Sequence, residues 1–555
     1  MIVLVLTFLL LGLAWKPGQG IIRIALQPIG PGHDHKSWCS LPPHVKIPED
    51  GMQNSSSLFQ NDEALRLQVE RLSALVSLPT ISYDDNGEVH EDHRWKTFDS
   101  LHNRLVKLFP LVHQHMKLEK INKYGLLYHI QGRDQNKKPM LFMAHQDVVP
   151  PGTPSMWTHP PFQSFFDGQW LWGRGAADCK SNLIGILSAM EALLAQDFKP
   201  SRTIIFSFGF DEETGGYRGA ASIARRLEET LGQHSLAIIH DEGGMGISKL
   251  GDVAYAFPAT AEKGFMDIAL SLETPGGHSS RPPKHTAIGI MSELIVALEG
   301  HPFTPKLDDR NPTRGVLECE AIYSPEFAEP WLKGELRSGR DFGKKIVEAR
   351  GDKIRWQIQT SQAVDVIGGG DKDNQLPERV NAIVNYRIAP HDSVDTVSKD
   401  VGKLLFEVSR RHGLAISGLG YAEESNGKGI LRVETKDVLL PSPVTPTSVD
   451  SEVWQIFAGS VRNVFETTPS LNEVKTVIPV GSIATGNSDT AHFWNLSRNI
   501  FRFTPSREGC RLGVHTIDER VEMNAHLEGI RVYYDLIRNF QQYSGEICEG
   551  ICRNL

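Results

Sequence analysis

The sequence predicts an α/β domain with a mostly parallel sheet, interrupted by a smaller inserted α+β domain. Between residues 125 and 241, short apolar runs typical of buried strands alternate with helical stretches: GLLYHI, PMLFMAH, TIIFSFGF and LAIIHD. Such alternation is typical of parallel strands that helices cover on both faces. Beyond residue 262, the segments DIALSLET and NAIVNYRI alternate apolar and polar residues with period two, as strands with one exposed face do.

The helices follow from apolar residues at helical spacing. In KSNLIGILSAMEALLAQ, residues 180–196, the apolar stripe consists of Leu183, Ile184, Leu187, Met190 and Leu194. Comparable patterns predict helices at 62–78, 221–231, 286–299 and 518–541.

These patterns divide the chain into six segments. The α/β domain comprises residues 61–263 and 393–545, and the inserted α+β domain comprises residues 264–392. The remaining segments are a signal peptide or signal-anchor at 1–20, a luminal linker at 21–60 and a tail at 546–555.

Charge and the N-terminus restrict the class of protein and its compartment. The formal net charge is -9 and no basic block is visible, which argues against nucleic acid as the main partner. The first 15 residues, MIVLVLTFLLLGLAW, are apolar. This length suits a signal peptide and is slightly short of the about 20 residues of a membrane span. We expect a secretory signal or an uncleaved single membrane anchor.

Two further features concern exposure to an oxidising lumen. Asn54 and Asn495 begin sequons for N-glycosylation, whereas Asn311 is excluded because proline follows it. The six cysteines are too few for a disulfide scaffold but allow one or two bridges. Cys548 and Cys552 are the expected participants.

Polar side chains follow the predicted strands at the point where each strand ends. Because ligands of open α/β sheets bind beyond the carboxyl ends of the strands, we expect these side chains at one edge of the sheet. They are His145 and Asp147, then Asp211, Glu212 and Glu213, then Asp241 and Glu242, with Asp178 directly before the helix at 180–196.

A cluster of carboxylates and imidazole needs cations if it is to remain ionised in a low-dielectric site. Oxygen and imidazole ligands without thiolates suit Zn, Mn or Co, and a shared carboxylate suits two metals about 3.5 to 4 Å apart. The alternative is that these acids are separate caps and surface groups. Asp147, two residues after His145, is placed to hold the His145 ring in its metal-binding tautomer.

Glu212 and Glu213 are adjacent, so they point to opposite sides of the local backbone. One of them can bind a metal while the other acts on substrate water as a general base. Their spacing does not indicate which residue has which role.

Seven ordered motifs resemble the zinc aminoacylase/carboxypeptidase metallopeptidase family over residues 60–540. They are AHQDVVP, WLWGRGAADCK, GFDEETGG, HDEGG, TPGGHSS, GNSDTAHFWN and GVHTIDERV. The WTHPPF and RFTP segments are most similar to its carboxypeptidase S branch, the fungal vacuolar Gly-Xaa carboxypeptidases. The resemblance implies a di-zinc exopeptidase-type catalytic domain and an inserted lid and dimerisation domain.

The resemblance also implies roles for individual residues. Around the metals, it implies that His145 and Asp241 bind one zinc and that Glu213 and His515 bind the other. Asp178 would bridge both zinc ions. Glu212 would be the general base, and Asp147 would be the partner that orients His145. In the inserted domain and beyond, it assigns His278 to the active site of a partner subunit, Asn374 to the oxyanion, Arg387 to the substrate carboxylate and Gly486 to a backbone contact with substrate. Asn374 as a turn residue and Arg387 as a surface strand residue are the structural alternatives.

The expected function is a zinc-dependent carboxypeptidase that hydrolyses the C-terminal amide bond of short Gly-Xaa peptides. Two Zn²⁺ per subunit, with Co²⁺ or Mn²⁺ as substitutes, would activate the attacking water together with the glutamate base. The alternatives are an N-acyl amino acid hydrolase and a non-catalytic metal-binding protein. The expected location is the vacuole lumen or vacuolar membrane, or outside the cell, and the resemblance implies a homodimer formed through the inserted domain.

Overall fold

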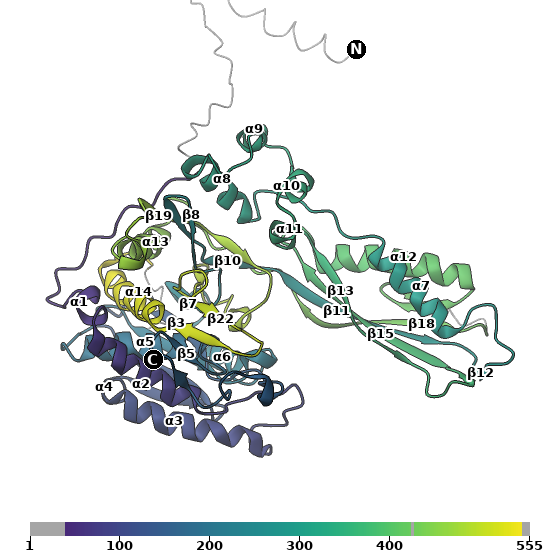
Figure 1. The fold of residues 1–555 in the computed structure, drawn as a ribbon, viewed down its shortest axis with the longest axis horizontal. Helices are drawn as coiled ribbons and strands as arrows, with labels where there is room; N and C mark the ends of the chain where they lie inside the picture. The colour runs from purple at the N-terminus through teal and green to yellow at the C-terminus, as the bar shows by residue number, and fades with distance from the viewer. Residues whose placement is uncertain (1–38, 423–426, 547–555) are drawn as a thin grey trace, which may run out of the picture.

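The computed structural model describes residues 39–422 and 427–546, and its centre is an eight-stranded mixed sheet (Figure 1). The strand order is β1-β2-β6-β3-β7-β21-β10-β20. The bounds are Lys117–Ile121 for β1, Gly125–Ile130 for β2, Ile204–Gly209 for β6, Met140–His145 for β3, Ile238–Asp241 for β7, Ile500–Arg502 for β21, Ala259–Glu262 for β10 and Ser482–Ala484 for β20.

The middle of this sheet is parallel, and an antiparallel pair of strands flanks it on each side. β3 runs parallel to both of its neighbours, β6 and β7, and β21 runs parallel to β7. β2 runs antiparallel to β6, and β10 antiparallel to β21. The predicted parallel arrangement is therefore found in β3, β6 and β7. These three strands end at the same edge of the sheet, and the candidate polar residues follow them there.

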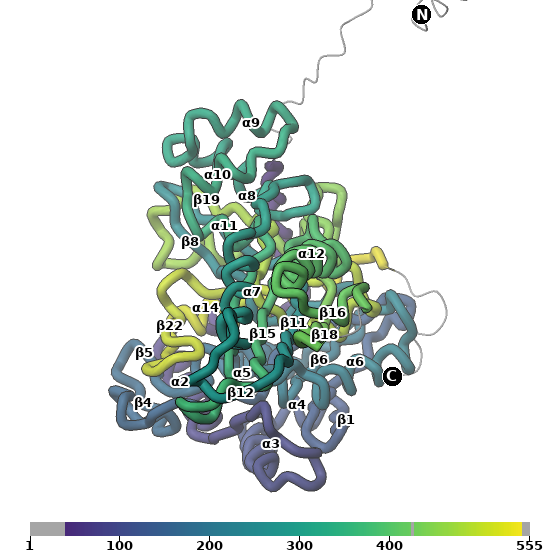
Figure 2. Tube along the Cα trace, turned by 90° about the vertical axis from the view of Figure 1, so that its right-hand side faces the viewer, coloured from purple at the N-terminus to yellow at the C-terminus, as the bar shows by residue number. Residues whose placement is uncertain are grey.

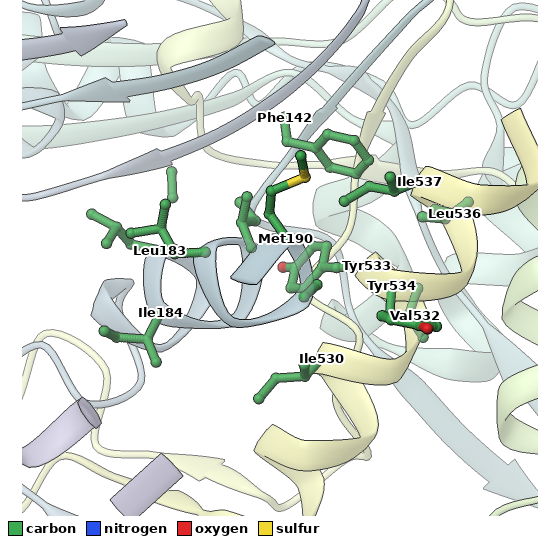
Figure 3. Close-up of a cluster of buried hydrophobic side chains, with 14 of the residues drawn as sticks. Phe142, Leu183, Ile184, Met190, Ile530, Val532, Tyr533, Tyr534, Leu536 and Ile537 are labelled. Atoms are coloured by element: carbon green, nitrogen blue, oxygen red, sulfur yellow. The ribbon is translucent and has the colours of Figure 1, made fainter. Parts of the chain in front are cut away.

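Helices cover both faces of the sheet, as the buried apolar strands require. Phe142 of β3 faces α5 (Lys180–Leu194) and α14 (Met523–Gln542), where it lies against Tyr533, with ring centroids 6.3 Å apart (Figure 3). Leu141, its neighbour in β3, belongs to the core on the other face with Ile223 of α6 (Ala220–Leu231). The layer on the side of Phe142 also includes α2 (Asp62–Val76), α3 (Thr97–Leu108), α4 (Pro110–His115) and α13 (Glu452–Phe465).

A second sheet lies in residues 264–439, a region named the lid here, which extends away from the α/β domain (Figure 1). Its order is β13-β15-β11-β18-β16-β17, and the burial of β11 alternates strictly along the strand, as the period-two pattern predicts. Two helices, α7 (Ala287–Glu299) and α12 (Val394–His412), lie side by side and share its apolar core (Figure 2). The strands are β11 Gly264–Glu273, β13 Ser361–Gly369, β15 Arg379–Ile388, β16 Ala415–Gly418, β17 Tyr421–Ala422 and β18 Ile430–Leu439.

The predicted end of the insert at residue 392 is wrong. β18 pairs antiparallel with β11 from Phe265↔Leu439 to Glu273↔Ile430, so the lid continues to residue 439. α12 is amphipathic, with Val397, Val401 and Leu405 buried, and an amphipathic helix has the same pattern whichever sheet it covers. The helical pattern of residues 394–412 therefore does not indicate to which domain α12 belongs.

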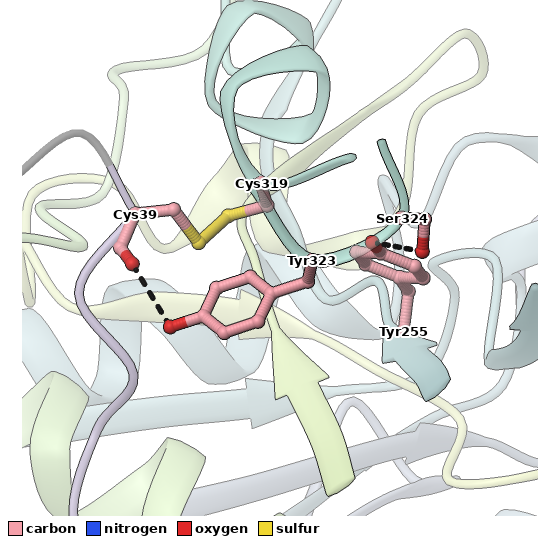
Figure 4. The surroundings of a disulfide bond; sticks show 5 residues. All are labelled: Cys39, Tyr255, Cys319, Tyr323 and Ser324. Atoms are coloured by element: carbon pink, nitrogen blue, oxygen red, sulfur yellow. Dashed lines mark hydrogen bonds between the residues drawn. A yellow bond between two sulfur atoms is a disulfide. The ribbon is translucent and has the colours of Figure 1, made fainter. Parts of the chain in front are cut away.

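The stretch between α7 and β13 is helical, although it carries little periodic signal. It contains α8 (Thr313–Tyr323), α9 (Leu332–Ser338), α10 (Gly343–Arg350) and α11 (Asp352–Ile358), which share a small core. A disulfide joins Cys319 of α8 to Cys39, and the Tyr323 hydroxyl donates to the Cys39 carbonyl at 3.3 Å (Figure 4). This bridge attaches α8 to the segment that precedes α1 (Ser55–Phe59).

Residues 39–60 pack on the α/β domain, so the predicted linker at 21–60 is wrong for this part. The Ser55 hydroxyl donates to Asp535 of α14 at 3.0 Å, and the Phe59 ring lies edge-on to Tyr534. The predicted signal segment at 1–20, together with Cys548 and Cys552, lies outside the described residues. Within residues 39–422 and 427–546, no helix combines the length and apolar character needed to cross a membrane.

Three small sheets complete the structure. β19, β9 and β8 form one beside α8, and β22, β23, β5 and β4 form another near the candidate site. β12 and β14, which are far apart in the sequence, form a short antiparallel pair in the lid. The bounds are β4 Phe165–Phe166, β5 Trp170–Trp172, β8 Ile247–Leu250, β9 Val253–Ala256, β12 Gly277–His278, β14 Gln375–Leu376, β19 Thr476–Pro479, β22 Arg511–Leu512 and β23 Arg520–Glu522.

Candidate metal centre and substrate site

His145 is the last residue of β3, and Asp147 follows it at the sheet edge. His145 Nδ1 lies 3.3 Å from Asp147 Oδ1 and 3.0 Å from the Asp147 carbonyl oxygen, so this contact orients the imidazole. The Ser82 hydroxyl and the backbone N–H groups of Glu212 (3.2 Å) and Glu213 (3.1 Å) donate to the Asp147 carboxylate. Asp147 thus fixes both the His145 ring and the turn that carries the two glutamates.

The Asp178 carboxylate lies between two imidazoles. Its Oδ1 is 3.2 Å from His145 Nε2, and its Oδ2 is 3.3 Å from His515 Nε2. Each oxygen of one carboxylate thus faces a different histidine, which is the arrangement of a ligand shared by two cations. His515 reaches this position from the loop between β22 and β23, where its φ of 58° is left-handed.

Glu212 and Glu213 point to different histidines, although they are neighbours in one short 3₁₀ turn, Glu212–Thr214. Glu213 Oε2 is 3.0 Å from His515 Nε2, whereas Glu212 Oε2 is 4.0 Å from His145 Nε2. This geometry places Glu213 in a cluster with Asp178 and His515, whose ligand atoms lie within 4.8 Å of one another. Glu212 is left beside the His145 side of the site.

Asp241 ends β7, the strand that runs parallel to β3 and carries His240 opposite Phe142. Its Oδ1 accepts a hydrogen bond from the Glu242 N–H at 2.9 Å, while its buried Oδ2 has no hydrogen-bond partner among the described residues. Burial raises the pKa of Asp241 to about 6, and the charge of His145 opposes this shift. A buried carboxylate oxygen without a partner is costly unless a cation is bound to it.

Carboxylates outnumber imidazoles in this cluster, and burial acts on all of them. It raises the pKa of Glu242 to about 8, and it raises the pKa of Glu212 well above its ordinary range. Hydrogen bonds that His515 donates to Asp178 and Glu213 raise the pKa of His515 to about 10. The excess of buried negative charge is what divalent cations would neutralise.

The donor set fits two such ions. His145 and Asp241 can hold one, Glu213 and His515 can hold the other, and Asp178 lies where it can serve both. Nitrogen and oxygen donors of this kind suit zinc and related first-row metals. Cys179 is buried and receives the His145 N–H at 3.2 Å, and burial raises the pKa of its thiol well above the ordinary value.

Several supporting residues were not identified from the sequence. Glu519 is fully buried and accepts hydrogen bonds from the backbone N–H groups of Gly175, Ala177 and Asp178, besides its ion pair with Arg174. It holds the loop that presents Asp178. Its only signal was its position in the motif GVHTIDERV, where an acidic residue after a candidate ligand could have been considered.

Asp211, the first of the three acids after β6, has a structural role. Its carboxylate accepts the N–H groups of Arg218 at 2.8 Å and Gly219 at 2.7 Å, directly before α6. Burial raises its pKa to about 6. Asp211 therefore anchors the loop between the 3₁₀ turn and α6 and does not face the histidines.

Arg387 lies at the base of the lid, next to the α/β domain. Its Nη1 donates to Asn487 Oδ1 at 3.1 Å, its Nε donates to Asn385 Oδ1 at 3.2 Å, and its guanidinium lies over the Phe265 ring. Asn487 in turn donates to the Lys263 carbonyl oxygen at 2.7 Å, at the point where the chain enters the lid. Gly486 is exposed directly beside Asn487, which sequence reasoning had not identified.

His278 and Asn374 lie together in another part of the lid. His278 lies in β12 and Asn374 directly precedes β14, and both residues are exposed. The Ser279 N–H donates to the Asn374 carbonyl oxygen at 3.2 Å. β12 is at the end of the lid away from the α/β domain (Figure 1). The structure therefore brings these two residues together but not to the histidine–carboxylate cluster of the same chain.

The two sequon asparagines are accessible. Asn54 and Asn495 are both exposed, and Asn495 lies in the loop before β21. Their glycosylation stays a prediction.

Residues 141–539 match the sequence profile of peptidase family M20/M25/M40. Among curated relatives, carboxypeptidase S of Saccharomyces cerevisiae is 38% identical over 532 residues, which cover 93% of this chain and 91% of the relative. An N-fatty-acyl-amino acid synthase/hydrolase of Mus musculus is 28% identical, with 89% of this chain and 91% of the relative covered.

Among solved structures, human carnosine dipeptidase 1 has the same fold. The match has a TM-score of 0.61 at 16% identity and covers 90% of this chain and all of the other chain. At this identity the likeness concerns the fold alone.

Proposed function

The chain belongs to peptidase family M20/M25/M40 and is a hydrolase of the metallo-carboxypeptidase type, and we propose that it removes the C-terminal residue from short Gly-Xaa peptides with two zinc ions. The observation that carries this proposal is Asp178, whose two oxygens face His145 at 3.2 Å and His515 at 3.3 Å. A carboxylate shared in this way is suited to a pair of cations.

We propose His145, Asp178 and Asp241 for one zinc and Asp178, Glu213 and His515 for the other. Zinc bound there would lower the pKa of a coordinated water and polarise the carbonyl of the substrate. Asp147 keeps the His145 ring in place through its contact with Nδ1, and Glu519 does the same for the Asp178 loop. These two residues act through the ligands and not on the substrate.

Glu212 is the proposed general base. It projects from the same turn as Glu213 but points away from His515, with its Oε2 4.0 Å from His145 Nε2. Its carboxylate would accept a proton from the attacking water and then donate it to the leaving amine. Burial raises the pKa of Glu212, which makes its carboxylate a better proton acceptor in the first transfer.

Selectivity for a free C-terminus is assigned to Arg387 and its surroundings. Asn385 and Asn487 orient the guanidinium, and the fork of an arginine matches a carboxylate in two parallel hydrogen bonds. The exposed backbone at Gly486 adjoins this position and is the proposed contact with the substrate backbone.

We further propose that His278 and Asn374 act in the site of a partner subunit, where they stabilise the oxyanion. Both are exposed at the lid end and adjacent to each other, so they are available to a second molecule as one unit. This assignment requires a homodimer formed through the lid.

The second candidate is hydrolysis of N-acyl amino acids, which the similarity to the Mus musculus N-fatty-acyl-amino acid synthase/hydrolase favours. Both substrates carry an amide next to a free carboxylate, so the proposed machinery serves either. Parallel assays of Gly-Leu and N-acyl leucines of increasing chain length, with and without chelator, separate the two. Turnover of neither substrate by zinc-loaded protein would refute both.

We propose that the protein acts in the vacuole lumen or outside the cell. The Cys39–Cys319 disulfide suits an oxidising compartment, and Asn54 and Asn495 are accessible to glycosylation. Whether residues 1–20 are cleaved or anchor the protein to the membrane is tested by sequencing the N-terminus of the mature protein.

A further inference from the structure

The lid carries a second cluster of metal-binding side chains, separate from the catalytic one. His285 precedes α7, Glu293 lies within α7, and His412 is the last residue of α12. One ligand atom from each of the three residues lies within 4.8 Å of the other two. We propose that His285, Glu293 and His412 form a zinc site that clamps α7 to α12.

The carboxylate of Glu293 lies between the two imidazoles. Its Oε1 is 3.6 Å from His285 Nδ1, and its Oε2 is 2.9 Å from His412 Nε2. In a tetrahedral zinc site with bonds of about 2.0 to 2.2 Å, neighbouring ligand atoms are about 3.3 to 3.5 Å apart. The two observed separations involve different oxygens of Glu293 and bracket this value. Because the three ligand atoms lie within 4.8 Å of one another, rotations of the side chains can bring them onto one ion.

The two imidazoles of the cluster meet edge to face. Their ring centroids are 4.8 Å apart and the ring planes are 75° from parallel, so they do not stack. Two nitrogen donors and one carboxylate oxygen suit zinc, with water as a fourth ligand. The side chains of His285 and Glu293 are 40% and 35% exposed, so solvent and ions have access, while that of His412 is 10% exposed and held in place.

The alternative is an ion pair between His412 and Glu293 that involves no metal. Arg411 supports this alternative in part, because its Nη2 lies 3.9 Å from Glu293 Oε2 and its charge competes with a bound cation. The ion pair, however, gives no role to His285, whose Nδ1 faces the second oxygen of Glu293. The two accounts therefore differ in what removal of His285 and of Arg411 should do.

The site has a structural consequence for the lid. α7 and α12 form the helical layer over the lid sheet, and the cluster joins the start of α7 to the end of α12 (Figure 2). An ion that binds only the folded state stabilises it in proportion to the logarithm of its concentration. Zinc should therefore raise the unfolding temperature of the lid independently of the catalytic ions.

The test compares zinc binding by the purified full chain and three variants, by equilibrium dialysis against Zn²⁺ with elemental analysis. His285→Ala should lose one zinc per subunit. The affinity for zinc at that site should fall by about 10- to 100-fold or more, because loss of even a supporting partner costs that much at a metal site. Arg411→Ala should bind zinc there more tightly, because a competing cation has been removed. His301→Ala, a change of an exposed lid histidine outside the cluster, is the matched control and should bind as the unmodified protein does.

Two outcomes would overturn the proposal. One is an equal number of bound zinc ions in His285→Ala and the unmodified protein. The other is a zinc-dependent rise in the unfolding temperature that is as large in His285→Ala as in the unmodified protein, since the catalytic ions alone would then account for the whole rise. Hydrolytic activity should be the same in His285→Ala and the control, so a failure here is distinguishable from a failure of the proposed catalytic site.

Discussion

In the α/β domain the candidate functional side chains converge within one chain, whereas in the lid they are spread over its length. His145, Asp178 and His515 come from segments far apart in the sequence and meet within hydrogen-bonding distance. In the lid, Arg387 lies at the base beside Asn487, while His278 and Asn374 lie at the other end. A parallel sheet collects polar groups at one edge, but a long antiparallel sheet separates them.

The comparison implies a division of labour. Under the proposed function, the α/β domain would hold the metals and the general base Glu212, the part of the lid next to that domain would bind the substrate carboxylate, and the far end of the lid would serve another subunit. Each of these three assignments can be broken separately by mutation.

The largest effect is expected from the general base in the α/β domain. Glu212→Gln should reduce kcat by about 10² to 10⁴-fold, because the variant cannot accept a proton from the attacking water. Zinc content should not change, since Glu213 and not Glu212 contacts His515. Steady-state kinetics with elemental analysis measures both, and the exposed Glu473→Gln is the control. Near-full activity of Glu212→Gln would refute the assignment.

The lid end is tested by complementation between subunits. His278→Ala should reduce kcat by about 10² to 10³-fold if His278 stabilises the oxyanion. A mixture with equally inactive Glu212→Ala should regain roughly one quarter of full activity, because half of the dimers then contain one intact site. Mixing after mild dissociation, followed by activity assay and light scattering, measures this. A mixture that stays inactive although mixed dimers form would show that His278 does not act across subunits.

The base of the lid should affect substrate affinity more than turnover. Arg387→Ala should raise KM by about 10- to 100-fold, since a hydrogen bond to a charged group contributes about 1.5 to 3 kcal/mol. Asn487→Ala should have a smaller effect in the same direction, because Asn487 only orients the guanidinium. Arg379→Ala, in the same strand but 63% exposed, is the matched control. A fall in kcat with KM unchanged would contradict the role of Arg387.

The smallest effect is expected from Lys263, where the chain passes from the α/β domain into the lid, and it concerns the free energy of unfolding. Burial lowers the pKa of Lys263 from 10.5 to about 7, and the charge of Arg387 adds to the shift. The unfolded state therefore binds more protons than the folded state between pH about 7 and 10.5, so stability rises with pH in this window.

Lys263→Met should lack this rise. The difference in free energy of unfolding between the variant and the unmodified protein should change steadily from pH 7 to pH 10 in denaturant titrations. Lys249→Met, which alters a lysine on the surface of the α/β domain, is the control. A difference that is constant over the window would show that the Lys263 side chain titrates normally.

The sequence predicted the α/β domain better than the lid for a physical reason. β3, β6 and β7 are fully buried apolar runs, so each strand and the polar residues after it could be recognised individually. The lid ends with β18, which pairs with β11 across more than 150 intervening residues. No local sequence pattern indicates such long-range pairing, and the predicted end of the inserted domain therefore lay too early in the chain.

The candidate site shows the same limit. His145, Asp241 and the pair Glu212 and Glu213 could be proposed from strand ends, and Asp178 from its position directly before a helix. Family resemblance alone indicated which glutamate binds metal, and it alone indicated His515, which lies in a loop with left-handed backbone. Glu519 and Asn487 support the site through hydrogen bonds that only the fold creates. The Cys39–Cys319 bridge likewise joins residues 280 positions apart, which spacing cannot reveal.

The most direct test of the account is a crystal structure of the active protein with anomalous scattering measured at the zinc edge. The account predicts two peaks about 3.5 to 4 Å apart, one beside His145 and Asp241 and one beside Glu213 and His515, with Asp178 in contact with both. No peak in this cluster, or a single peak that Asp178 does not contact, would contradict it.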